Sequence, residues 1–124
     1  MISGIGVDIV AIDRMAGLSE HALVRMFHPD ELAQALAISS GVSSGRNQFL
    51  AGRFAAKEAL GKALGTGLMD IALQDICTRN DPQGRPYLEL YGNAKEKLAG
   101  RQALLSISHD APMAIAVVLL QDPS

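Results

Sequence analysis

The sequence predicts an α+β fold in which an antiparallel sheet packs against one long central helix. Residues 49–64 are rich in Ala and Leu, contain no Pro and are followed by Gly65, as expected for a helix with a left-handed C-terminal cap. Apolar residues alternate along residues 2–12 and fill residues 113–121, which is typical of strands. A strong turn signal at residues 81–84 separates two more strand-like segments and predicts a hairpin.

Length and composition limit the classes of protein that fit. A chain of 124 residues predicts a single domain, and 48% hydrophobic against 19% charged residues indicates a globular chain. A formal net charge of −2 argues against a general nucleic-acid binder. No apolar run approaches the roughly 20 residues of a membrane-spanning helix, and the first residues do not resemble a signal peptide. We therefore expect a cytoplasmic protein with no nucleic-acid or membrane partner.

The first strand, predicted over residues 2–12, carries an unusual aspartate. Ile5, Val7 and Ile9 alternate onto one face, which leaves Asp8 on the other face among aliphatic neighbours. Aspartate is depleted in strands, so its presence needs a reason. A strand-end bulge, a hydrogen bond to nearby backbone and a functional role all remain open at this point.

Two helices and a loop are predicted between this strand and the central helix. Residues 13–27 read as helical with an interruption near Gly17, after which Ser19 begins a new helix. Pro29 opens a second helix that extends to about residue 38. The Ser- and Gly-rich residues 39–45 are expected to form a mobile surface loop.

The chain after the central helix is predicted to be mostly β. Strands are expected at residues 71–79 and 85–91, on either side of the turn. A short helix follows at residues 93–100, capped by Asn93. The fold closes with strands at residues 104–110 and 113–121, joined by a turn at Ala111 and Pro112.

Four charges interrupt the apolar central helix. Helical spacing places Arg53 and Lys57 on one side and Glu58 and Lys62, four residues apart, on a roughly opposite side. The simplest interpretation is an ordinary Glu58–Lys62 ion pair worth about 0.3–0.5 kcal/mol, with the other two charges solvated. Charges on a mostly buried helix nevertheless need partners, and these are either protein groups or a ligand.

Three motifs together resemble one enzyme family. Residues 54–67 read F-x-A-K-E-A-x-x-K-A-x-G-T-G, residues 6–14 read G-x-D-I-V-x-I-x-R, and residues 106–109 read S-x-S-H. The chain thereby resembles the 4′-phosphopantetheinyl transferases of the holo-[acyl-carrier-protein] synthase type along nearly its whole length. The resemblance implies the compact fold of that family and a homotrimer with active sites at subunit interfaces, which would also cover the apolar central helix.

The resemblance implies a specific reaction. The enzyme would use Mg²⁺ to transfer 4′-phosphopantetheine from coenzyme A to a serine of an apo acyl carrier protein, in support of fatty-acid biosynthesis. Asp8 and Glu58 would be the magnesium ligands, since Mg²⁺ binds through one or two carboxylates and leaves positions for substrate phosphates. Lys62 would neutralise charge on the departing phosphate or protonate it. The general base for the serine is left open.

The resemblance also implies binding residues, each of which has a simpler explanation. Basic side chains would bind the coenzyme A phosphates, and an Arg can bind one phosphate through two hydrogen bonds. Gly65 and Thr66 would approach the ligand with backbone and hydroxyl, although a helix cap explains them nearly as well. Carrier docking would use Arg14 and Arg25, which otherwise form a solvated helix face. The expected phosphate-binding residues are Arg46, Arg53, Lys57 and His109.

The same motifs bear on two other interpretations. Ser108, His109 and Asp110 do not assemble a hydrolase triad, because adjacent residues on a strand point to opposite faces; a hydrogen-bonded turn histidine is the alternative for His109. Gly45, where the family often has more basic residues, leaves room for a non-catalytic coenzyme A or nucleotide-binding module with the same fold. Binding without transfer would distinguish that module from the enzyme.

Overall fold

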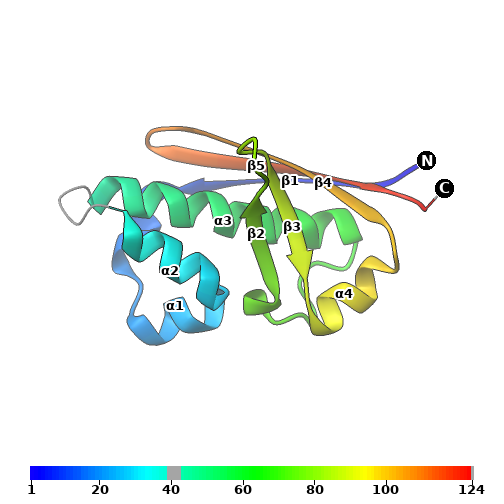
Figure 1. The fold of residues 1–124 in the computed structure, drawn as a ribbon, viewed down its shortest axis with the longest axis horizontal. Helices are drawn as coiled ribbons and strands as arrows, with labels where there is room; N and C mark the ends of the chain where they lie inside the picture. Colours follow the sequence, from blue (N-terminus) through cyan, green and yellow to red (C-terminus); the bar gives the residue numbers. More distant parts are fainter. Residues whose placement is uncertain (39–42, 124) are drawn as a thin grey trace.

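A three-stranded antiparallel sheet forms one layer of the molecule in the computed structural model, which describes residues 1–38 and 43–123. The strands are β1 (Ile2–Ala11), β4 (Gln102–Asp110) and β5 (Met113–Gln121), in the order β1-β5-β4. Both chain ends lie at the same end of this layer (Figure 1). The first strand stops at Ala11, one residue before the predicted end, because Ile12 begins a short 3₁₀ helix.

Helix α3 (Ser43–Leu64) runs along one face of the sheet and forms the second layer (Figure 1). It begins six residues earlier than predicted, so the expected loop at residues 39–45 falls partly within the helix and partly outside the described residues. The core lies between the layers, where Leu60 on α3 and Val118 and Leu120 on β5 have no exposed surface. The α+β fold with a sheet on a long central helix is therefore confirmed.

Two glycines in β1 allow the sheet to approach α3 very closely. A Cβ atom added at Gly6 would lie 2.0 Å from the carbonyl oxygen of Ala59, and one added at Gly4 would lie 2.2 Å from that of Ala63. Either contact is far inside van der Waals range with backbone, so no side chain fits at these positions. The close approach brings β1 alongside the C-terminal half of α3.

Three short helical segments connect β1 to α3. They are the 3₁₀ helix η1 (Ile12–Gly17), α1 (Glu20–Met26) and α2 (Pro29–Ala37). The predicted interruption after Gly17 is confirmed, and Ser19 caps α1 by accepting a hydrogen bond from the backbone of Ala22. Helix α2 begins with a capping box, in which the His28 ring accepts a hydrogen bond from the backbone of Asp30 and the Glu31 carboxylate accepts one from the backbone of His28.

The hairpin and a short helix complete the fold. After the 3₁₀ helix η2 (Leu73–Asp75), strands β2 (Ile76–Asn80) and β3 (Pro86–Leu90) pair antiparallel in a separate two-stranded sheet, and α4 (Gly92–Leu98) follows. The strand predicted from residue 71 thus starts only at Ile76. Asn93 does not cap α4, because its side-chain amide donates to the carbonyl of Asp70 instead.

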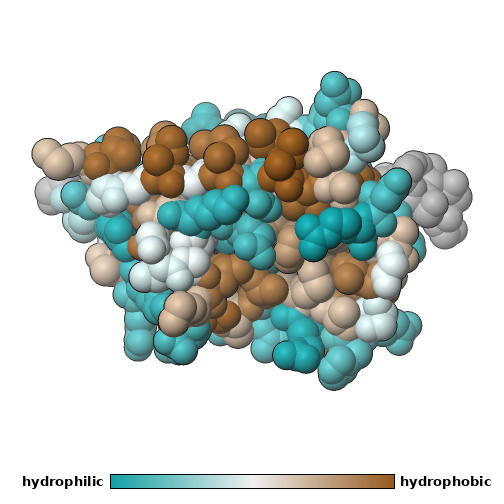
Figure 2. Space-filling model, turned by 180° about the vertical axis from the view of Figure 1, so that it is seen from behind, coloured by the Kyte–Doolittle hydropathy of each residue, from teal (hydrophilic) through white to brown (hydrophobic). Residues whose placement is uncertain are grey.

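The outer face of the larger sheet, opposite α3, is apolar and exposed. Strand register places Ile5 beside Leu119, Val7 beside Val117 and Ile9 beside Ile115 on this face. The exposed fractions of Ile5, Val7 and Ile9 are 67%, 49% and 59%. Figure 2 shows the hydrophobic atoms gathered along this layer of the molecule. Within the described part of the chain, no helix has the length and apolar character to cross a membrane.

Candidate active site

Asp8 and Lys62 meet where β1 passes α3. Lys62 donates from Nζ to Oδ1 of Asp8 over 3.2 Å and to the carbonyl of Val7 over 3.0 Å. Asp8 lies on the helix-facing side of β1, and its side chain is 18% exposed whereas that of Lys62 is 56% exposed. The pair therefore lies at the rim of the molecule, where a ligand can reach it.

Glu58 completes this group from the same helix. Partial burial raises the pKa of its carboxyl group, and the negative charge of Asp8 raises it further, while Lys62 and Arg14 act in the opposite direction. Glu58 therefore holds its proton more strongly because a second carboxylate lies nearby, and two neighbouring carboxylates are suited to binding a cation. Glu58 and Lys62 thus belong to a three-residue cluster with Asp8 and not to an isolated helical ion pair.

Arg14 also lies close to this cluster. It sits on η1, directly after β1, with its guanidinium 5.6 Å from the centre of the Phe54 ring. Its positive charge acts to lower the pKa of the Glu58 carboxyl group. The structure therefore places Arg14 beside the carboxylates and apart from α1, which carries Arg25, so the two expected docking residues are on different elements.

Asp8 and Glu58 are the two carboxylates of this cluster that could hold a magnesium ion. Mg²⁺ typically takes one or two protein carboxylates and fills its other octahedral positions with water and phosphate oxygens. Asp8 and Glu58 supply two such carboxylates. The part of the chain that the structure describes contains no group of three or more His, Cys, Asp or Glu side chains arranged for a metal.

Lys57 is not available to a ligand. Its side chain has no exposed surface, and Nζ donates to Oε1 of Glu31 over 2.7 Å and to the carbonyls of Leu73 and Ile76. Burial lowers the pKa of the Lys57 ammonium group, against the raising effect of Glu31. The expectation that Lys57 contacts coenzyme A phosphates is therefore not met, because these three acceptors use all of its hydrogens.

Arg53 and His109 line one hollow of about 280 Å³ near the N-terminal half of α3. Arg53 stacks over the Phe49 ring at 4.0 Å and donates from Nη2 to the Asn80 side chain over 2.9 Å. His109 Nε2 lies 3.2 Å from the amide nitrogen of Gln48. Sequence reasoning did not single out Gln48 or Asn80, because neither belongs to a motif and only the fold brings them to this hollow.

Arg46 lies apart from that hollow. Its Nε donates to the carbonyl of Ala35 over 3.1 Å, which ties the start of α3 to α2. It lines a different, mainly apolar hollow of about 230 Å³ together with Leu23 and Leu50. The structure thus brings together two of the four expected phosphate-binding residues and separates Arg46 and Lys57 from them.

Gly65 and Thr66 directly follow the C-terminal end of α3 at Leu64. Gly65 has a left-handed φ of 82° and donates from its backbone to the carbonyl of Lys62, and Gly67 donates to Gly61. These bonds satisfy carbonyls that the helix leaves unpaired. The cap role is therefore present, and the exposed Thr66 hydroxyl lies one turn beyond Lys62.

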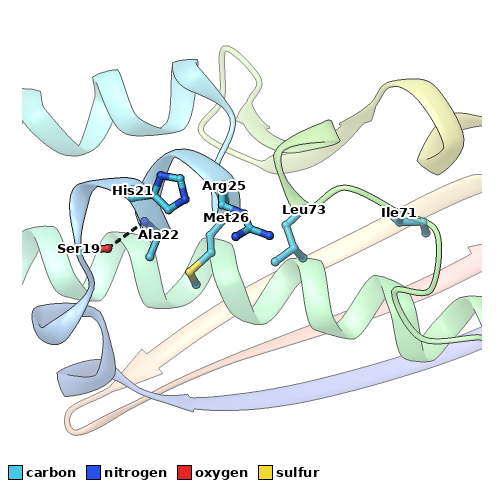
Figure 3. A pocket seen from close by; sticks show the side chains of 7 residues that line it. All are labelled: Ser19, His21, Ala22, Arg25, Met26, Ile71 and Leu73. Atoms are coloured by element: carbon cyan, nitrogen blue, oxygen red, sulfur yellow. Dashed lines mark hydrogen bonds between the residues drawn. The ribbon is translucent and has the colours of Figure 1, made fainter.

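Arg25 lines the largest of these hollows, of about 440 Å³, between α1 and the segment before β2. Figure 3 shows Arg25 and Met26 on α1 with Leu73 across from them and Ile71 farther along. The hollow combines a cation with apolar walls. It is suited to a partner surface that carries both acidic and apolar side chains.

The comparisons with known proteins identify the family of this chain. Residues 4–117 match the 4′-phosphopantetheinyl transferase superfamily. A holo-[acyl-carrier-protein] synthase of Treponema denticola is 44% identical over 126 residues, covering 98% of this chain and 99% of the relative. The chain therefore belongs to the 4′-phosphopantetheinyl transferase superfamily. Within it, the near full-length similarity makes this protein an enzyme of the holo-[acyl-carrier-protein] synthase type.

Solved structures support the same assignment. The holo-(acyl-carrier-protein) synthase from Bacillus anthracis, crystallised in complex with CoA (3′,5′-ADP), superimposes with a TM-score of 0.84 at 35% identity and 99% coverage of both chains. The holo-[acyl-carrier-protein] synthase from Neisseria meningitidis gives a TM-score of 0.84 at 31% identity, covering 98% of this chain and 100% of the other. The resemblance predicted from the three motifs is confirmed.

Proposed function

We propose that this enzyme transfers 4′-phosphopantetheine from coenzyme A to a serine of an apo acyl carrier protein, in a Mg²⁺-dependent reaction that supports fatty-acid biosynthesis. The observation that carries the proposal is the cluster of Asp8, Glu58 and Lys62 in a chain of this family. In the reaction, the serine oxygen bonds to the phosphorus that bears pantetheine. The bond from that phosphorus to the bridging oxygen breaks, the serine hydroxyl gives up its proton to a base, and adenosine 3′,5′-bisphosphate leaves.

The three clustered residues have distinct roles in this proposal. Asp8 and Glu58 would hold Mg²⁺, which supplies charge stabilisation to the phosphate oxygens when bound. Lys62 is held by Asp8 and by the Val7 carbonyl at the exposed edge of the carboxylates. From there its ammonium group neutralises the charge that grows on the leaving phosphate, or gives it a proton.

Coenzyme A would be bound between two copies of the chain in a homotrimer. Arg53 and His109 lie at a hollow near the start of α3, whereas the carboxylate cluster lies toward its end. The five-residue step from Arg53 to Glu58 rotates the side chains by roughly 140° about the helix, so they point in different directions. In a trimer, Arg53 and His109 of one copy would bind coenzyme A together with the carboxylates of the next copy. The exposed apolar sheet face would form the contact between the copies.

The carrier protein would dock on the hollow beside Arg25. A cationic side chain next to apolar walls matches a partner with acidic and apolar groups, and rim charges of this kind act on association. Arg14, on η1 beside Glu58, would contact the carrier protein next to the reacting groups.

Intact-protein mass spectrometry tests the proposed reaction. An apo acyl carrier protein incubated with this enzyme and coenzyme A should gain the mass of one phosphopantetheine group with Mg²⁺ and should not gain it with a chelator. Glu58→Ala should remove the gain in a protein that keeps its thermal unfolding transition. Coenzyme A binding with no mass gain on several carrier proteins would instead favour the non-catalytic binding module.

A further inference from the structure

The buried Lys57–Glu31 pair joins α3 to the two elements that helix α1 mainly packs against, α2 and η2. Both side chains have no exposed surface. Glu31 accepts from Lys57 and from the backbone of His28 through Oε1, and from the backbone of Thr78 through Oε2. Lys57 in turn donates to the carbonyls of Leu73 and Ile76. The pair therefore ties α3 to α2, to η2 and to β2.

Lys57 also reaches the residue that ends α1. Its ammonium nitrogen lies 5.6 Å from the ring centre of Phe27, which is fully buried and caps the C-terminus of the helix. A cation over an aromatic face in a buried setting is attractive. Lys57 thus contacts the end of α1 directly, in addition to the elements beside it.

Helix α1 depends on these neighbours for its position. It is seven residues long and has no fully buried residue of its own. It packs mainly against η2 and α2, which are the two elements that Lys57 and Glu31 hold. A helix this short is marginal by itself and takes its stability from tertiary contacts.

From this arrangement we infer that Lys57 and Glu31 are positioning residues for the carrier-docking face, acting through α1 and through the wall formed by Leu73. The inference rests on the proposed function in assigning the Arg25 hollow to the carrier protein. It separates two neighbours in the sequence: Glu58 serves the reacting phosphates, and Lys57 holds the surface that receives the protein substrate. Lys57 touches no reacting group in this role.

Two variants test the inference. Lys57→Met keeps the length of the side chain and removes the charge, and Glu31→Gln is the milder change if the first protein does not fold. Amide hydrogen exchange of peptides spanning Glu20 to Phe27 should become at least about tenfold faster in either variant under conditions where the protein stays folded. The carrier-protein KM should rise about tenfold, with kcat and the coenzyme A KM within about twofold of wild type.

A matched control separates positioning from general destabilisation. Val118→Ala removes buried volume from β5, which is not among the elements that α1 mainly packs against, and should leave α1 exchange close to wild type at equal fraction folded. A folded Lys57→Met or Glu31→Gln protein with wild-type exchange in α1 would overturn the inference, as would kcat and both KM values changing together. If Arg25→Glu leaves the carrier KM unchanged, the docking assignment fails instead, and the exchange result still decides whether the pair positions α1.

Discussion

Lys62 and Asp8 are joined by a 3.2 Å hydrogen bond although they lie 54 positions apart in the chain. The bond exists because Gly4 and Gly6 let β1 press against the backbone of α3. Asp8 therefore faces the helix at the level where Glu58 and Lys62 project. The closeness of two carboxylates and one ammonium group leads to predictions about pH, metal binding and packing.

The raised pKa of Glu58 predicts an unusual pH dependence of stability in metal-free protein. Because the folded state favours the protonated carboxyl, this contribution is fully present below the unfolded pKa and is lost as pH rises through the folded value. Glu58→Gln has no carboxyl group to ionise at this position, so the variant does not lose this stability as pH rises. The variant should thus be more stable than wild type at pH 7 with chelator, and the difference in Tm should shrink toward pH 4.

Thermal melts from pH 4 to pH 8 check this prediction. Glu96→Gln, on the exposed surface of α4, is the matched control and should follow wild type throughout. A Glu58→Gln protein that is less stable than wild type at pH 7 would show that the charged carboxylate is stabilised by its neighbours and not strained by Asp8.

Magnesium should stabilise the folded protein through the same carboxylates. A ligand that binds only the folded state at ten times its Kd adds about 1.4 kcal/mol to the free energy of unfolding. Wild type should therefore gain Tm with Mg²⁺ and lose the gain with chelator. Asp8→Asn keeps an oxygen that can accept from Lys62 but removes one negative charge from the site. This variant should lose most of the Tm gain with Mg²⁺. An equal shift in both proteins would place the ion elsewhere.

Gly6→Ala should be strongly destabilising. The added methyl group would lie 2.0 Å from the Ala59 carbonyl oxygen, and because this neighbour is helix backbone it cannot turn aside. We expect a loss of about 3 kcal/mol or more in the free energy of unfolding, at the upper end for overpacking. Gly17→Ala is the control, since no atom lies within 4 Å of its added Cβ. Urea denaturation of both variants gives the comparison, and equal midpoints would contradict it.

The pattern of the sequence predicted the layers, and the directions of the Asp8, Glu58 and Lys62 side chains, for a physical reason. Alternation in β1 and the four-residue spacing of Glu58 and Lys62 are local properties, and each sets the direction of a side chain. The motifs then indicated which directions converge. Local periodicity also placed Lys57 on the opposite side of α3 from Glu58, as observed.

The partner of Lys57 was beyond local reasoning. Its acceptor Glu31 lies 26 positions away, and only the packing of α2 against α3 shows that this charge is buried in protein contacts. The same limit applies to Gln48 beside His109, 61 positions apart. Such contacts depend on how helices and strands pack, and residue spacing along one element does not encode them.

Arg25→Glu should weaken carrier docking without affecting coenzyme A. Reversing a charge at the rim of a docking surface acts on association with an acidic partner, so the carrier KM should rise by about tenfold or more at low salt and less at high salt. The coenzyme A KM should stay within about twofold. Arg85→Glu, an equal charge change in the exposed β2–β3 turn, serves as control and should leave both constants unchanged. An unchanged carrier KM in Arg25→Glu would contradict the docking assignment.

Ile5→Glu should dissociate the proposed trimer while each chain stays folded. Ile5 is 67% exposed on the outer sheet face, so a charge there is tolerated in a single chain but would be buried without a partner between subunits, at a cost of several kcal/mol. Light scattering after size exclusion should give wild type three times the chain mass of 13.1 kDa and the variant one. Leu36→Glu, at a 71% exposed position on α2, should remain a trimer. A wild-type protein that elutes as a monomer would remove the shared site from the proposal, because Arg53 and His109 would then have no second copy to serve.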